Sequence, residues 1–209
     1  MRIDSLQTSP DRAGRYWVTF EDGTRLGLYR QTVEDFGLYI GKELTEEEKE
    51  QLLTAAGKMS AKMRAVRIVS ASSVSKRDLE ERLVRKGEDP EQAKEAVQWM
   101  EDLHLVDDRN TAEQVVHSCI SKGYGLQRAK QALYEKRIPT QYWDEALEDY
   151  PDQWEKIESF LRSRLDADSD QKQIKKAIDA LIRRGHSYGT IRRVLSDLSF
   201  DSNDDFEDF

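Results

Sequence analysis

The chain has 209 residues, of which 37% are apolar and 35% charged, and its formal net charge is −8. No run of about 18 apolar residues is present, which excludes a conventional membrane-spanning helix, and no hydrophobic signal region follows Met1, so we expect a cytoplasmic protein. Cys119 is the single cysteine, which excludes an internal disulfide, and we expect it to be a buried core residue.

The charge is distributed unevenly along the chain. Residues 1–56 hold seven basic against eleven acidic side chains, residues 57–198 hold 26 against 25, and residues 199–209 hold five acidic side chains and no basic one. The excess acidity therefore lies at the two ends, and it argues against indiscriminate binding of polyanions by the whole chain.

The first part of the sequence predicts a small β-structure. Aromatic and β-branched residues flank Glu21-Asp22-Gly23, a turn signal of the Asp-Gly type. We expect strands at Ile3–Gln7, Arg15–Phe20 and Thr24–Tyr29, followed by a short helix over Thr32–Phe36 that ends at Gly37. Residues 1–45 are thus predicted to form a β-rich N-terminal extension.

The rest of the chain, from the predicted N-cap Thr45 to about Leu198, is helical in pattern and repeats itself. Three segments align without a gap, namely 79–97, 129–147 and 177–195, each with apolar or small residues at its first, fifth, fifteenth and nineteenth positions. Because i and i+4 share one face of a helix, each segment predicts two helices whose apolar faces meet in an αα-hairpin.

Each hairpin has recognisable turn and capping residues. The ninth position, at the turn, is Gly87, Arg137 or Gly185, and glycine is the usual residue where a helix ends in a left-handed conformation. Arg137 breaks this pattern, so we expect a different turn geometry there. The second helices are predicted to start at the N-caps Asp89, Thr140 and Ser187.

A further predicted helix precedes each hairpin, at 56–70, 108–121 and 152–165. The fold class is therefore mainly α, with three tandem three-helix repeats in an elongated, curved array and a small three-stranded N-terminal subdomain. The expected domains are 1–45, 46–107 (linker helix and repeat 1), 108–150 (repeat 2), 151–198 (repeat 3) and an acidic disordered tail at 199–209.

No catalytic or metal-binding constellation can be recognised. His104, His117 and His186 lack partners at ligand spacing, so we expect no metal, no cofactor and no enzyme activity. Asp107-Asp108 is interpreted as a helix start, and Gly123-Tyr-Gly125 as a helix–helix turn because the rest of a phosphate-loop pattern is missing.

A basic cluster marks the last repeat. Its members lie on predicted outward helix faces, and residues 183–193 contain no acid. Such a cluster either solvates its helices or binds phosphate or carboxylate groups of a partner. The candidate partner-binding or DNA-binding residues are Lys175, Lys176, Arg183, Arg184, Arg192 and Arg193.

The run 103–139 resembles the signature of the RecX regulatory proteins. The matching residues are Asp107, Asp108 and Ala112 in one element, Gly123 and Gly125 in the next, and Gly185 within RRGHS of the last repeat. The resemblance covers about 57–198, and the β-rich start is similar to the extension of longer members. Arg137-Ile138 departs from the usual Lys-Gly-Ile.

The resemblance implies a non-catalytic modulator of the RecA recombinase. Such proteins dock in the groove of RecA filaments on single-stranded DNA and inhibit ATP hydrolysis and strand exchange, which modulates recombination, DNA repair and the SOS response. We expect a monomer whose contact with single-stranded DNA runs through the filament or is weak and direct.

Two other functions remain open at this point. The hairpins could act as helix-turn-helix elements that bind DNA independently of RecA, although their second helices begin with very different residues. The array could also be a scaffold for another protein, with Tyr124, Tyr134, Tyr142 and Trp143 as interface anchors. The acidic tail could compete with DNA for a basic surface, imitate the acidic, Phe-ended tails of single-stranded-DNA-binding proteins, or only solvate the chain.

Overall fold

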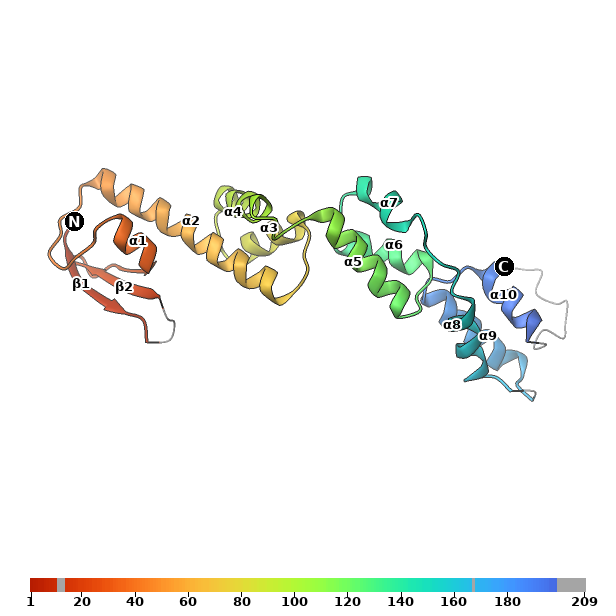
Figure 1. Cartoon of the computed structure of the whole chain (residues 1–209). Coiled ribbons are helices and arrows are strands. Elements are labelled where there is room, and N and C mark those ends of the chain that lie inside the picture. Colours follow the sequence, from red (N-terminus) through yellow and green to blue (C-terminus); the bar gives the residue numbers. More distant parts are fainter. Residues whose placement is uncertain (11–13, 167, 199–209) are drawn as a thin grey trace. The chain divides into compact units, whose positions relative to one another are not determined.

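A computed structural model describes residues 1–10, 14–166 and 168–198 (Figure 1). Its contacts divide the chain into two compact units, Met1–Val106 and Asp107–Phe209, which are described one at a time below. The acidic tail, for which disorder was predicted, lies outside the described residues.

Unit 1 begins with a three-stranded antiparallel sheet in the order β1-β2-β3. The strands are β1 (Ile3–Thr8), β2 (Arg15–Phe20) and β3 (Arg25–Tyr29), as predicted. Alternate residues point to opposite faces of a strand, so Val18, Phe20 and Leu28 share one face, where they are buried.

Two helices cover that face of the sheet. They are α1 (Arg30–Asp35) and the N-terminal half of α2 (Glu46–Ala71), and Val33 and Leu52 are their buried contributions to the core. Thr45 caps α2 as predicted, in a reciprocal capping box with Glu48. The linker helix and the first helix of repeat 1, predicted separately, form this single continuous helix.

The first repeat packs α3 (Lys76–Arg85) and α4 (Pro90–Asp102) against the C-terminal half of α2. Small residues on the helices allow close approach: Ala61 and Ala65 of α2 and Ala93 and Ala96 of α4 are all buried. Leu79 and Leu83 complete this core from α3.

Unit 2 holds the second and third repeats. The second consists of α5 (Asp108–Ser121), α6 (Leu126–Glu135), a 3-10 turn η1 (Thr140–Tyr142) and α7 (Trp143–Leu147). The third consists of α8 (Trp154–Arg162), α9 (Gln171–Arg183) and α10 (Tyr188–Asp197). Each has its own apolar cluster.

The repeat positions read from the sequence are core positions. All four are buried in the first and third repeats, and in the second the first and fifth are buried. Trp143 and Leu147, at the fifteenth and nineteenth, are only partly buried, because α7 is a single short helix; the Trp143 indole N–H still donates to the Ile138 carbonyl at 3.0 Å. Cys119 is buried, as expected.

The three hairpin turns share one geometry, so the expectation of a different turn at Arg137 is wrong. The ninth residue has φ of +90° at Gly87, +57° at Arg137 and +86° at Gly185. In each turn the ninth N–H donates to the sixth carbonyl at 2.8–2.9 Å and the tenth N–H to the fifth carbonyl at 3.1–3.2 Å. This is the Schellman pattern, which satisfies the last carbonyls of a helix whether or not glycine is present.

The predicted caps are correct in two hairpins and wrong in one. Asp89 and Ser187 accept backbone N–H groups of the helices that follow them. Thr140 does not, because the chain there forms η1, whose N-cap is Pro139 and has no side-chain cap. The second repeat therefore starts its last helix through a tight 3-10 turn.

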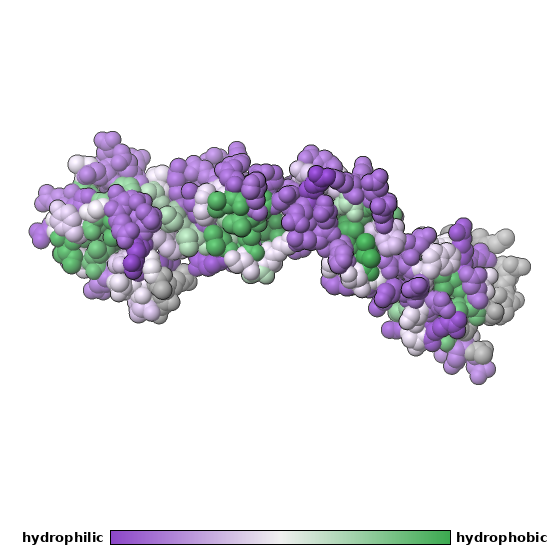
Figure 2. All heavy atoms as spheres, in the orientation of Figure 1, coloured by the Kyte–Doolittle hydropathy of each residue, from purple (hydrophilic) through white to green (hydrophobic). Residues whose placement is uncertain are grey.

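Hydrophilic side chains cover most of the face drawn in Figure 2, and the hydrophobic ones gather in separate patches. This agrees with the narrow apolar stripe of each helix. In the part of the chain that the structure describes, no helix combines the length and apolar character that a membrane span requires.

Candidate partner-binding surface

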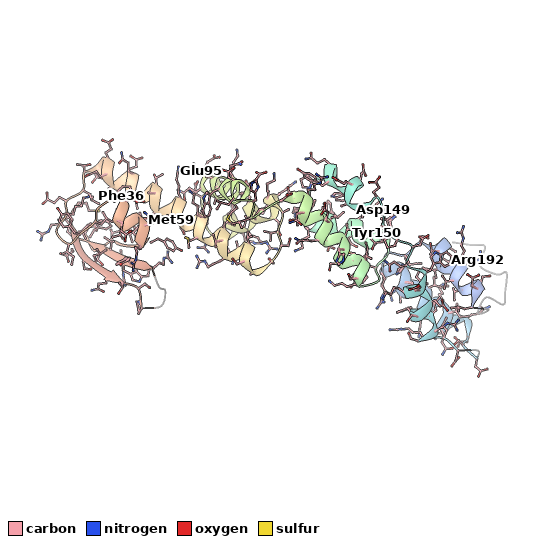
Figure 3. The ribbon with its side chains drawn as sticks, viewed as in Figure 1. Phe36, Met59, Glu95, Asp149, Tyr150 and Arg192 are labelled. Atoms are coloured by element: carbon pink, nitrogen blue, oxygen red, sulfur yellow. The ribbon has the colours of Figure 1, made fainter. Side chains whose placement is uncertain are left out.

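The six predicted basic residues lie on α9, on α10 and in the turn between them. Five are exposed, and Arg192, on α10 (Figure 3), is half-buried. Lys175 and Arg192 interact with other residues of the chain, whereas Lys176, Arg183 and Arg193 form no ion pair with a described residue. The six residues are thus close together in the sequence, but they differ in exposure and in their interactions within the chain, and therefore in their availability to a partner.

Arg184 has a structural role as well. Its guanidinium lies 4.7 Å from the centre of the Phe160 ring, and that of Arg164 lies at the same distance from the same ring. Phe160 packs against the core of the third repeat, so Arg184 covers an apolar side chain while remaining exposed. Lys176, Arg183 and Arg193, which are exposed and form no ion pair with a described residue, are therefore the stronger candidates for binding a partner.

The Gly-x-Gly turn and the RRGH turn, 60 residues apart in sequence, meet directly in unit 2. The Gly125 N–H donates to the Arg184 carbonyl at 2.9 Å, and the Gln127 N–H donates to the Gly185 carbonyl at 3.2 Å. A Cβ on Gly125 would lie 2.1 Å from the Gly185 oxygen, and one on Gly185 would lie 2.3 Å from the Arg128 nitrogen. The two glycines allow the second and third repeats to join backbone to backbone.

His186 closes this joint. Its Nε2 lies 3.1 Å from the Gly123 carbonyl, and because a carbonyl only accepts, Nε2 carries the proton. Burial lowers the pKa of His186 below its ordinary value, an effect that the Gly123 hydrogen bond opposes and nearby Arg184 reinforces. The ring is therefore a neutral structural donor.

Tyr150 anchors the linker between the second and third repeats at the same place (Figure 3). Its hydroxyl donates to the Tyr124 carbonyl at 2.7 Å, inside the Gly-x-Gly turn. Burial raises the pKa of Tyr150 to about 12, with a smaller contribution from Cys119. The phenol stays neutral and keeps its hydrogen bond over the whole physiological range.

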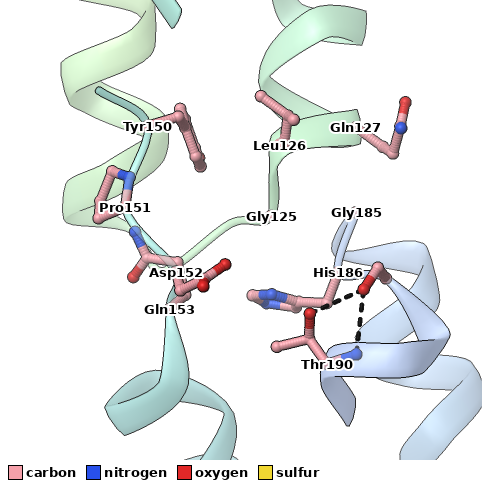
Figure 4. A pocket seen from close by; sticks show the side chains of 11 residues that line it. Gly125, Leu126, Gln127, Tyr150, Pro151, Asp152, Gln153, Gly185, His186 and Thr190 are labelled. Carbon is pink, nitrogen blue, oxygen red and sulfur yellow. Dashed lines mark hydrogen bonds between the residues drawn. The ribbon is translucent and has the colours of Figure 1, made fainter. Parts of the chain in front are cut away.

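A pocket of about 240 Å³ lies beside the joint (Figure 4). The His186 ring points toward Asp152 and Gln153, while the Ser187 hydroxyl caps α10 by accepting the Thr190 N–H at 3.1 Å. The histidine of the pocket, His186, is already hydrogen-bonded to the Gly123 carbonyl. No cluster of three potential metal ligands occurs among the described residues.

The first family-motif element begins α5. Asp107 is the N-cap, and its side chain accepts the N–H groups of Arg109 at 2.8 Å and Asn110 at 3.3 Å. Asp108 is buried at the first helical position, and Ala112 is fully buried against the second-repeat core. Asp107 and Asp108 thus begin a helix and Gly123 and Gly125 form a turn, so both motif elements have a structural role.

The structure shows a second feature of the repeats, which the sequence analysis missed. The sixth position of each hairpin, directly after the buried leucine, carries an exposed apolar residue: Val84 is 40%, Tyr134 65% and Ile182 46% exposed. The signal was in the alignment, since an apolar residue at that position breaks the amphipathic pattern in all three repeats. Of the four aromatic anchors considered, Tyr134 is exposed, and Tyr124, Tyr142 and Trp143 are partly buried.

Comparison with known proteins identifies the family. A family model described as RecX, second three-helix domain, matches residues 107–147. The regulatory protein RecX of Chlorobaculum tepidum is 33% identical over 142 residues, which cover 66% of this chain and 88% of that protein. The chain belongs to the RecX family. The Clostridioides difficile RecX is 27% identical over 210 residues, and the match covers 97% of both proteins.

Solved RecX structures share the fold. One RecX crystal structure superposes with a TM-score of 0.63 at 21% identity, and covers 93% of this chain and 98% of its own. The RecX of Lactobacillus salivarius gives a TM-score of 0.60 at 23% identity, and covers 70% of this chain and 99% of its own. The mainly helical RecX fold with its N-terminal sheet is therefore the fold of this chain.

Proposed function

We propose that this RecX-family protein is a non-catalytic regulator that binds RecA filaments on single-stranded DNA and inhibits ATP hydrolysis and strand exchange. Family membership carries the proposal. Through this inhibition the protein would modulate recombination, DNA repair and the SOS response, acting in the cytoplasm as a monomer and without a cofactor.

Two surface features support a binding role. The exposed apolar side chains at the sixth hairpin position recur in all three repeats, and apolar residues at repeated places suit a partner that is itself a repeating polymer. Arg183 follows one of them, Ile182, so an apolar contact and an unpaired cation lie side by side in the third repeat. We take these residues as the candidate contact surface of each unit: Val84 in unit 1, and Tyr134, Ile182, Arg183 and Arg193 in unit 2.

The decisive measurement is RecA-catalysed, DNA-dependent ATP hydrolysis. We expect the purified chain to suppress it at substoichiometric amounts and to co-sediment with the filaments. If ATP hydrolysis by RecA continued at its normal rate and this protein stayed in the supernatant, the proposal would be wrong.

Charge reversal tests the basic part of the surface. Arg183→Glu combined with Arg193→Glu should weaken filament binding and its inhibition, because it replaces two unpaired cations. Melting temperature should stay nearly unchanged, since both side chains are exposed. Lys94→Glu with Lys172→Glu makes the same change in net charge at exposed sites outside the surface and serves as the control; equal loss in both variants would mean a general charge effect.

RecA-independent DNA recognition by helix-turn-helix elements gains less support. The second helix of the second repeat is a 3-10 turn followed by a five-residue helix, α7. Five residues rise about 7.5 Å, too short to place several side chains along a major groove. Sequence-specific duplex binding without RecA would reinstate this alternative.

A further inference from the structure

The N-terminal sheet has a second face that lies opposite its core. Cross-strand pairing sets Trp17 of β2 against Gly27 of β3, and Arg15 against Tyr29. These pairs alternate with Val18 and Leu28, which belong to the buried core, so they lie on the outward face.

Two arginine–aromatic stacks form on this outward side. The Arg25 guanidinium lies 4.4 Å from the centre of the Trp17 ring, and the Arg15 guanidinium lies 4.9 Å from that of Tyr29. Arg67 of α2 adds a third cation, since its Nη2 donates to the Tyr29 hydroxyl at 3.2 Å. Arg15, Trp17, Arg25, Tyr29 and Arg67 are called the arginine–aromatic face below.

The indole of Trp17 packs against Gly27 of the neighbouring strand. A Cβ built on Gly27 would lie 3.1 Å from the ring, so the absence of a side chain at Gly27 is what lets the ring settle there. Covering a strand glycine with an aromatic ring is a known stabilising device. That device does not require a guanidinium on the ring, and Arg25 is exposed.

The arginines of this face have no acidic partners. Arg15, Arg25 and Arg67 form no ion pair with a described carboxylate, whereas Arg64 and Arg82 of the same unit are paired with Glu88 and Asp78. Asp4 is the sole acidic residue in the three strands. A locally cationic surface thus lies within an otherwise acidic stretch of chain, which favours an anionic partner.

We propose that the arginine–aromatic face binds single-stranded nucleic acid. Bases stack on guanidinium planes, and arginine also pairs with phosphates. The Arg25 guanidinium, exposed and held on the Trp17 ring, can therefore meet both parts of a nucleotide. A single strand fits because its bases are free to stack, whereas those of a duplex are already stacked on each other. The proposal does not depend on RecA.

Binding of the full chain to a fluorescently labelled oligo(dT), without RecA, tests the proposal by anisotropy. Arg25→Glu should weaken binding at least about fivefold, the equivalent of one lost stacked base. Lys94→Glu, the same charge change at an exposed site elsewhere in unit 1, should leave it nearly unchanged. Arg25→Lys keeps the charge without the planar group and should give an intermediate affinity.

Two further arms separate stacking from charge and locate the site. An abasic strand of equal length should bind more weakly than oligo(dT), and duplex DNA or polyglutamate should not compete as well as oligo(dT) or oligo(rU). With iodouracil in the strand, ultraviolet light should cross-link it to the peptide that contains Trp17 or Tyr29. Cross-links confined to residues 107–198, an Arg25→Glu variant that binds normally, or equal binding of the abasic strand would each overturn the proposal.

Discussion

The tenth position of the hairpins is occupied by an acidic, an apolar and an imidazole side chain in the three repeats. Its residues Glu88, Ile138 and His186 are all buried, as expected for the residue that follows a Schellman turn. Ile138 packs in the second-repeat core, whereas the Glu88 carboxylate accepts from Arg64 and Ser60 of α2, and His186 donates to Gly123. Each buried polar group is satisfied by a partner from a neighbouring helix or turn.

Protonation of His186 should destabilise unit 2 at acidic pH. Because burial lowers its pKa in the folded protein, the unfolded chain takes up a proton first as the pH falls below about 6.5. The free energy of unfolding should therefore decrease below that pH and level off once the folded-state pKa is passed. Urea unfolding over this range should show a shallower pH dependence for His186→Gln than for the wild-type chain; an equally steep dependence would contradict this role of His186.

Truncation of a buried leucine tests the core positions. Leu133→Ala or Leu181→Ala should lower the free energy of unfolding by about 2–5 kcal/mol, because each removes a fully packed side chain and leaves a cavity. Tyr134→Ala, one residue on and 65% exposed, is the matched control and should change it by less than about 0.5 kcal/mol. Chemical denaturation measures both; equal effects would mean that the two faces of α6 are assigned the wrong way round.

At the scale of the element, the turn matters more than the residue that occupies it. Gly87, Arg137 and Gly185 adopt the same left-handed conformation, which costs a non-glycine residue about 1–2 kcal/mol. The second repeat keeps the turn despite that cost, because its two Schellman hydrogen bonds and the packing of Leu133 and Ile138 hold the chain there.

Alanine substitution at two turn glycines separates backbone strain from packing. Gly87→Ala should cost about 1–2 kcal/mol from its positive φ alone, since nothing lies within 4 Å of the added Cβ. Gly185→Ala adds a clash with the Arg128 backbone and should cost at least about 1 kcal/mol more. Thermal or chemical unfolding measures the difference; similar losses at both glycines would contradict the tight joint between repeats.

At the scale of the whole molecule, the described core is a series of separate clusters. Unit 1 has one cluster under the sheet and one in the first repeat, and unit 2 has one in each of its repeats. A repeat architecture of this kind exposes the same position many times over, which suits binding by many weak contacts.

Serine substitution at the sixth hairpin position tests whether these repeated apolar residues contribute to binding. Val84→Ser, Tyr134→Ser and Ile182→Ser should each reduce inhibition of the RecA ATPase modestly. The triple variant should combine the losses multiplicatively, because residues that share no partner contribute independently. Stability should change by less than about 0.5 kcal/mol per site. Leu53→Ser, at an exposed apolar residue outside the hairpins, is the control; full inhibition by the triple variant would refute the role of these residues.

The sequence alone predicted the helices, the three strands and the repeat register, because amphipathic periodicity and capping chemistry are local properties. It also led to the RecX family through Asp107, Asp108 and the Gly-x-Gly turn. Two predictions from the sequence were wrong. Arg137 adopts the same left-handed turn as the two glycines, and Thr140 begins a 3-10 turn instead of capping a helix.

What only the tertiary structure decided is which residues far apart in sequence meet. Nothing local pairs Gly125 with Gly185, His186 with Gly123, or Arg25 with Trp17, because such contacts follow from how helices and strands pack. The same holds for the basic cluster: its sequence marked six equivalent cations, and packing against Phe160 set Arg184 apart from Arg183 and Arg193. Local periodicity fixes which face of an element is apolar, and packing alone fixes what that face touches.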